Sequence, residues 1–85
     1  PMTLFPNPSS GVINIVSQTD LDPETSLKLL AINGMQVMIN DIEIIKHNAR
    51  NISGNISQDI PNGIYILEVK NGDQTIRQKL IIHNK

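Results

Sequence analysis

Two segments of alternating apolar and polar side chains, joined by Asn71-Gly72, constrain the fold of this chain more than any other feature. Residues 64–70 and 74–83 have the period of two that is typical of half-buried β-strands. An Asn-Gly pair between such segments favours a two-residue hairpin turn. The cross-strand pairs that this turn predicts are Lys70 with Asp73, Leu67 with Ile76, and Ile64 with Lys79. We therefore expect an antiparallel hairpin in the last third of the chain.

The predicted pairing gives this hairpin one apolar face and one charged face. The apolar face, which we expect in the core, consists of Tyr65, Leu67, Val69, Ile76, Leu80 and Ile82. The charged face consists of Glu68, Lys70, Arg77 and Lys79. A shift of the register by one residue would set Leu67 against Arg77, so the alternation specifies which face is buried.

Turn signals recur along the rest of the chain at intervals of roughly 8 to 12 residues, a spacing typical of β-sandwiches. Asn33-Gly34 predicts a second hairpin between residues 27–32 and 35–39, both of whose faces are largely apolar. Further strand patterns lie at residues 12–16, 41–45 and 52–56, with polar connections at 18–26 and 47–51. We predict a single all-β domain over residues 1–85, an immunoglobulin-like antiparallel β-sandwich of about seven strands.

Two prolines exclude a helix near the start of the chain. Pro6 and Pro8 fix their own φ angles and bias the residues before them toward extended conformations. We therefore predict a rigid entry loop over residues 4–11, with residues 1–3 as a linker.

The composition argues against several classes of function. The chain has 85 residues and no Cys, so its core must rest on aliphatic burial without disulfides. A net charge of −1 and only two aromatic residues, Phe5 and Tyr65, argue against nucleic acid as a partner. The apolar runs are far shorter than the ~20 residues of a membrane-spanning helix. We expect neither a nucleic-acid partner nor a membrane span.

Motifs of catalysis and of cofactor binding are absent from the sequence. It contains neither a G-x-S-x-G motif nor a glycine-rich phosphate loop. Asp20, Asp22 and Glu24 alternate as Ca²⁺ ligands can, but Pro23 departs from the EF-hand pattern, and a solvated acidic loop is the better interpretation. The two histidines, His47 and His83, lie in no cluster with ligand spacing and are interpreted as surface residues. We expect no enzyme activity, no metal and no cofactor.

The segment from Ile60 to Tyr65 is similar to the tyrosine corner of immunoglobulin-like and fibronectin-like sandwiches. In such a corner, a Tyr entering a late strand donates a hydrogen bond to nearby backbone. We therefore expect Tyr65 to stabilise the fold.

Three motifs follow one another along the chain at characteristic positions. The first is P-N-P-x-x-G, formed by Pro6, Asn7, Pro8 and Gly11. The second is G-x-Y-x-[LV]-x-V over residues 63–69, and the third is a basic and aliphatic final strand over residues 79–85. Between them, a hairpin has Gly34 at its turn, with Asn33 where an Asp is often found. In this order they resemble the C-terminal sorting domains of the type IX, or Por, secretion system of Gram-negative bacteria.

That resemblance implies a folded secretion signal at the end of a larger passenger protein. Such a domain crosses the inner membrane unfolded, folds in the periplasm and is recognised by the outer-membrane translocon. A sortase-like cysteine peptidase then usually removes it, with the cut just upstream of Pro6-Asn7-Pro8. The domain would be a substrate of that peptidase, and the passenger would be secreted or held at the cell surface.

The residues that we expect to act in recognition belong to these motifs, to the turn of the middle hairpin and to the charged face of the C-terminal hairpin. They are Pro6, Asn7, Pro8, Gly11, Gly34, Gly63, Tyr65, Arg77, Lys79, Leu80, Ile81, Ile82 and Lys85. A final strand at a sheet edge would present its backbone and the outward side chains Arg77 and Lys79 to a receptor. A second hypothesis is that the apolar outer face of residues 27–39 docks on the passenger or, in weak self-association, on a second copy.

The main alternative is a fibronectin-like accessory module that binds carbohydrate or spaces the domains of a surface protein. Such a module needs no position at the C-terminus, whereas a sorting signal does. A natural stop codon directly after Lys85 would distinguish the two. An enzyme would instead require a deep pocket that holds a titratable pair.

Overall fold

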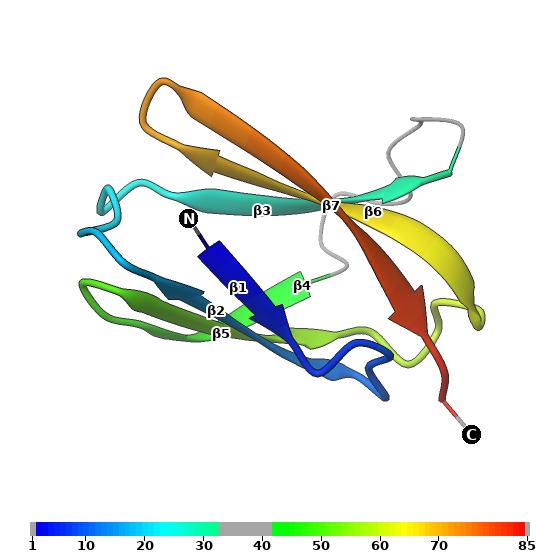
Figure 1. Ribbon diagram of the computed structural model, residues 1–85. Helices are drawn as coiled ribbons and strands as arrows, with labels where there is room; N and C mark the ends of the chain where they lie inside the picture. The colour runs from blue at the N-terminus through cyan, green and yellow to red at the C-terminus, as the bar shows by residue number, and fades with distance from the viewer. Residues whose placement is uncertain (1, 33–41, 85) are drawn as a thin grey trace.

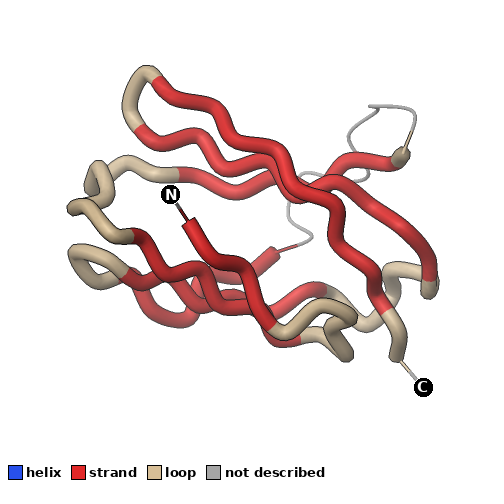
Figure 2. Tube along the Cα trace, in the orientation of Figure 1, coloured by secondary structure: helices blue, strands red, loops and turns tan. Residues whose placement is uncertain are grey.

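The computed structural model describes residues 2–32 and 42–84, which form two facing layers of β-strands (Figure 1). The described residues contain seven strands and no helix. The strands are coloured red in Figure 2. The strands are β1 (Met2–Phe5), β2 (Val12–Ser17), β3 (Ser26–Ala31), β4 (Ile42–His47), β5 (Asn51–Ile56), β6 (Gly63–Asn71) and β7 (Gln74–Ile82). The predicted all-β fold of about seven strands is confirmed.

The strand order is that of an immunoglobulin constant-type sandwich. One sheet has the order β1-β2-β5-β4 and the other β3-β6-β7, and all neighbours are antiparallel. In immunoglobulin terms these sheets correspond to strands A-B-E-D and C-F-G. β7 is an edge strand of the smaller sheet.

Alternation along β2 and β5 turns one face of the larger sheet to the core. Ile13 and Ile15 of β2 are buried, whereas Val12 and Val16 on either side of them face outward. The strand predicted at residues 12–16 is therefore confirmed, one residue longer at its end.

The first strand was not predicted from the sequence. Met2–Phe5 forms β1, which pairs with β2, and Leu4 is buried. The entry loop predicted over residues 4–11 is therefore wrong for Leu4 and Phe5, because neither proline precedes them and their backbone remains free to join the sheet. The residues assigned to a linker include Met2 and Thr3, which also lie in β1.

The C-terminal hairpin forms, but its register differs by two residues from the predicted one. The loop residues are Gly72 and Asp73, and Asn71 pairs with Gln74. Gly72 has φ +61°, the left-handed conformation that the first loop position of a type I′ turn requires. The observed pairs that replace the predicted ones are Lys70 with Thr75, Leu67 with Gln78, and Ile66 with Lys79.

Asn71 lies at the end of β6, and not in the turn as predicted, because its side chain binds the loop between β2 and β3. Its Oδ1 accepts hydrogen bonds from Asp22 N at 2.7 Å and from Thr25 Oγ1 at 3.1 Å, both in the loop between β2 and β3. A shift of two residues leaves every side chain on its predicted face, because the side-chain period of a strand is two. The inner and outer faces of the hairpin are therefore as predicted.

The middle of the chain differs from the predicted second hairpin. β3 pairs with β6, whereas the Asn33-Gly34 turn and residues 35–39 lie outside the described residues. The strand predicted at 41–45 is β4, which belongs to the other sheet and has a bulge between Ile44 and Lys46. The predicted polar connections at 18–26 and 47–51 join strands, with small differences at their ends.

The core is almost entirely aliphatic and lies between the two sheets. It consists of Leu4, Ile13, Ile15, Leu21, Leu29, Ile52, Ile56, Ile60, Leu67, Val69, Leu80 and Ile82. Both sheets contribute to this cluster, so neither sheet buries its apolar face without the other.

Two Ile-to-Ala substitutions test this core. Ile13 has an exposed fraction of 0%, and we expect Ile13→Ala to lower the free energy of unfolding by roughly 2 to 5 kcal/mol, because it leaves a cavity. Ile45 has an exposed fraction of 56%, and Ile45→Ala should cost less than about 1 kcal/mol. Urea unfolding of both variants measures the difference, and equal losses would contradict the assignment of the core.

Candidate functional site

The N-terminal motif and the final strand, far apart in sequence, lie side by side in the fold. Residues 6–11 connect β1 to β2 in the larger sheet and pass along the C-terminal half of β7 in the smaller one (Figure 1). A parallel bridge joins Ser9 to Ile82. We call the contact between residues 7–9 and β7 the clasp.

Asn7 makes the first part of the clasp with its side-chain amide. Its Nδ2 donates a hydrogen bond to Lys79 O at 2.9 Å, and its Oδ1 accepts one from Ile81 N at 2.9 Å. An amide has both the donor and the acceptor that an unpaired strand edge requires. Asn7 therefore satisfies the edge of β7 much as a neighbouring strand would.

Ser9 makes the second part, and all its polar groups are used although only 1% of it is exposed. Its backbone N donates to Ile81 O at 2.8 Å, and its O accepts from His83 N at 2.8 Å. Its hydroxyl donates to Val12 O at 2.7 Å and accepts from Gly11 N at 3.0 Å. Sequence reasoning missed Ser9, because it occupies a variable position of the P-N-P-x-x-G pattern and serines are common in loops.

Gly11 returns the chain from the clasp to β2. Its φ is +140°, a conformation that residues with a side chain rarely adopt, and its carbonyl accepts a hydrogen bond from Ile56 N at 2.6 Å. The glycine of the motif is thus required by the backbone at this point.

The clasp covers only part of the β7 edge. Lys79 O and the N–H groups of Ile81 and His83 face the loop, and backbone groups two residues apart in a strand point the same way. The backbone groups of Thr75 and Arg77 therefore face the same edge. In the described part of the chain, no strand pairs with them there.

The second motif forms the predicted tyrosine corner. Gly63 begins β6, and Tyr65 Oη donates a hydrogen bond to Pro61 O at 2.7 Å. Nearby, Asn62 Oδ1 accepts a hydrogen bond from Asn84 N at 2.7 Å and holds the chain after β7. Sequence reasoning did not single out Asn62, because its partner is remote in sequence.

The residues assigned to recognition in β7 divide between the two faces of the sheet. Leu80 and Ile82 are buried in the core, so their side chains support the fold and face no partner. Arg77 and Lys79 are exposed on the outer face, and Ile81 is half-buried there. Arg77 pairs with Glu68 across the hairpin, with Nη2 to Oε2 at 2.8 Å.

The clasp thus brings together two groups of the assigned residues, the Pro6-Asn7-Pro8 motif and the final strand. Pro6 and Pro8 flank Asn7 and are exposed, next to the end of the strand that carries Arg77 and Lys79. Gly34 and Lys85 lie outside the described residues, as does much of the hairpin face over residues 27–39 that was expected to dock.

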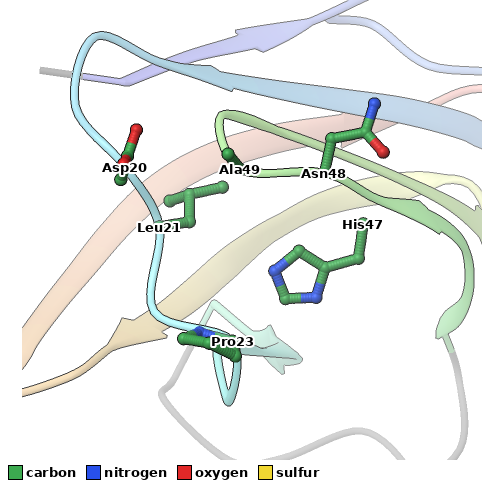
Figure 3. Close-up of a pocket in the computed structure, with 6 residues that line it drawn as sticks. All are labelled: Asp20, Leu21, Pro23, His47, Asn48 and Ala49. Carbon is green, nitrogen blue, oxygen red and sulfur yellow. The ribbon is translucent and has the colours of Figure 1, made fainter.

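A shallow pocket of about 340 Å³ lies between the loop after β2 and the turn before β5 (Figure 3). Its lining is Asp20, Leu21, Pro23, His47, Asn48 and Ala49. Asp20 Oδ1 accepts a hydrogen bond from Arg50 Nε at 2.9 Å, and Asp22 Oδ1 accepts one from Glu24 N at 2.7 Å. Asp20 thus bonds to the turn before β5, whereas Asp22 bonds within its own loop.

His47 and His83 are exposed. Among residues 2–32 and 42–84, no three His, Asp or Glu side chains converge as metal ligands would. In the same residues, no helix is long and apolar enough to cross a membrane.

Removing the Asn7 amide should weaken the clasp. We expect Asn7→Ala to lower the free energy of unfolding by about 1 to 2 kcal/mol, since two hydrogen bonds are lost. Amide hydrogen exchange should accelerate at Ile81 more than at His83, whose partner is Ser9 O. The matched control is Ser10→Ala, at an exposed neighbouring position. Unchanged exchange at Ile81 in Asn7→Ala would contradict the clasp.

Tyr65→Phe tests the tyrosine corner. The ring is retained, and only the hydrogen bond to Pro61 O is removed, so we expect a loss of about 1 kcal/mol in the free energy of unfolding. Chemical denaturation compares it with the parent protein and with Tyr65→Ala, which should lose more. Parent-like stability of Tyr65→Phe would show that the ring alone matters.

Comparison with known protein families supports the family that the motifs indicated. Residues 3–83 match the family described as "Secretion system C-terminal sorting domain". A comparison with curated proteins found no similar sequence. The match covers nearly the whole chain, and the family consists of signals for export, not of enzymes. The chain therefore belongs to the C-terminal sorting domains of the type IX secretion system, which direct proteins to the cell surface or the exterior.

Proposed function

We propose that residues 1–85 act as one folded secretion signal, which the outer-membrane translocon recognises before a sortase-like cysteine peptidase removes it from its passenger. The clasp is the observation that carries this proposal. The P-N-P-x-x-G motif and the final strand both belong to the family pattern, and Asn7 and Ser9 join them directly. The family match favours this role over a carbohydrate-binding or spacer module.

The clasp makes the recognised surface depend on folding. Asn7 and Lys79 are separated by 72 positions in the chain, and they meet only after both sheets have assembled. An unfolded signal displays neither the covered nor the open part of the β7 edge. The translocon would therefore distinguish a passenger whose signal has folded in the periplasm from one whose signal has not.

The position of β1 bears on peptidase cleavage. Met2–Phe5 pairs with β2 along its whole length, and the side chain of Leu4 is buried. Cleavage within these residues would require the strand to leave its sheet, because proteases act on extended chain that is free of such pairing. We place the cut N-terminal to Met2, upstream of β1 as well as of Pro6-Asn7-Pro8.

Reporter export tests the proposal. A periplasm-targeted reporter fused to residues 1–85 should reach the cell surface or the medium of a bacterium with a type IX system. The same fusion truncated before Lys79 should stay in the periplasm, since it lacks Leu80, Ile81 and the rest of the half of β7 that the clasp holds. Immunoblots of the periplasm, surface and medium measure the distribution.

The control for this experiment is the Ile45→Ala fusion, which alters a side chain far from the clasp and should be exported normally. Export of the truncated fusion at the level of the intact one would contradict the proposal. Release of a reporter fragment with residues 2–5 still attached would contradict the proposed position of the cut.

A further inference from the structure

The open part of the β7 edge has the features of a strand-addition site. The N–H and C=O groups of Thr75 and Arg77 face this edge, beyond the reach of the clasp. Unpaired edge groups of this kind accept an extended chain from another molecule. Because Asn7 occupies the edge from Lys79 O onward, an added strand must end there, and its register is limited to the stretch from Thr75 to Lys79.

An apolar groove of about 300 Å³ adjoins this stretch on the outer face of the sheet. Ile64, Ile66 and Ile32 contribute its apolar lining, and Arg77 and Lys79 lie along the side toward the edge. Ile32 is 68% exposed and Ile64 46%, which is unusual for large aliphatic side chains in one groove. A partner on the edge could therefore also cover apolar surface.

The charge of this face indicates what the partner carries. The charged side chains that β3, β6 and β7 turn outward are Lys28, Lys70, Arg77, Lys79 and Glu68. The one carboxylate in this set, Glu68, is already paired with Arg77. The face is thus basic, although the whole chain has a net charge of −1. Acidic side chains on a partner would complement it.

The same charges disfavour a second copy of the chain as the occupant. Antiparallel pairing of two β7 edges centred on Arg77 would set this cation opposite its own copy and bring both Lys79 side chains near the contact. Like charges directly opposite one another in a sheet are destabilising. An acidic partner avoids this repulsion.

We propose that the β7 edge from Thr75 to Lys79 binds an extended acidic segment of a partner protein by strand addition. The outward side chains of that segment lie beside Arg77 and Lys79, and apolar residues of the same partner cover the groove at Ile64. The inference rests on the proposed role as a recognised signal and adds the chemistry of the recognising segment.

Titration of the 85-residue domain with two synthetic peptides tests this proposal. In one peptide valine alternates with glutamate, and in the other valine alternates with lysine. We expect the acidic peptide to shift the backbone NMR signals of residues 75–79 and the basic peptide to leave them unchanged. Binding of the acidic peptide should weaken with added salt.

Two variants separate the contribution of the backbone to peptide binding from the contribution of charge. Thr75→Pro removes an N–H from the open edge and none from the ladder with β6, and proline is tolerated on edge strands, so it should abolish binding. Lys79→Glu should weaken binding on the order of fivefold, the effect of an exposed ion pair. Lys46→Glu on β4 makes the same change of charge in the other sheet and should bind normally. If Thr75→Pro does not fold, Lys79→Glu and the salt dependence decide.

The proposal is overturned if neither peptide binds, if both bind equally, or if residues 75–79 show no shifts. A dimer in sedimentation that Thr75→Pro and Lys79→Glu abolish would assign the edge to a second copy. That result would also overturn the proposal. Export separates this inference from the proposed function. If Thr75→Pro and Lys79→Glu fusions are exported normally, strand addition fails and the signal role stands, whereas retention of the parent fusion contradicts the signal role itself.

Discussion

The hydrogen bonds between residues 7–9 and β7 determine how the two sheets meet at the end of the sandwich that carries the candidate site. They join a loop of the larger sheet to the edge strand of the smaller one, in a chain that has no disulfide. At the other end of the sandwich, Asn71 holds the loop between β2 and β3 in a similar way. Aliphatic burial between the sheets supplies most of the stability, while these polar contacts determine how the sheets' ends meet.

The clasp also covers part of an exposed sheet edge, a feature that makes β-sandwiches prone to association. An edge strand exposes unpaired backbone groups that invite pairing with other chains. Asn7 and Ser9 cover the C-terminal half of this edge, and among the described residues no strand pairs with the half from Thr75 to Lys79, which lies beside a basic face. A single loop therefore limits uncontrolled association and defines the length of edge available to a partner. The same contacts place the family's first and last motifs next to each other, although they lie at opposite ends of the chain.

The sequence predicted the strands and faces better than the pairing. Alternation identified the strand at residues 12–16 and the inner residues of the C-terminal hairpin, because the side-chain period reports burial directly. It did not identify the register, since two registers two residues apart bury the same set, and the choice between them rests on Asn71 and the remote loop that it binds. β1 was missed because four residues next to a proline-rich loop make a weak strand pattern, and its pairing comes from β2.

The candidate site likewise combines features that local sequence patterns predict with contacts between remote residues that they do not. Local patterns were enough to predict an all-β sandwich, its buried faces, the tyrosine corner at Tyr65 and the motifs of a sorting domain, because each pattern consists of residues close together in the chain. The folded chain was needed to show that Asn7 and Ser9 bind β7 and which stretch of its edge they cover. These contacts join residues more than 70 positions apart, and no local pattern carries information about a partner that far away.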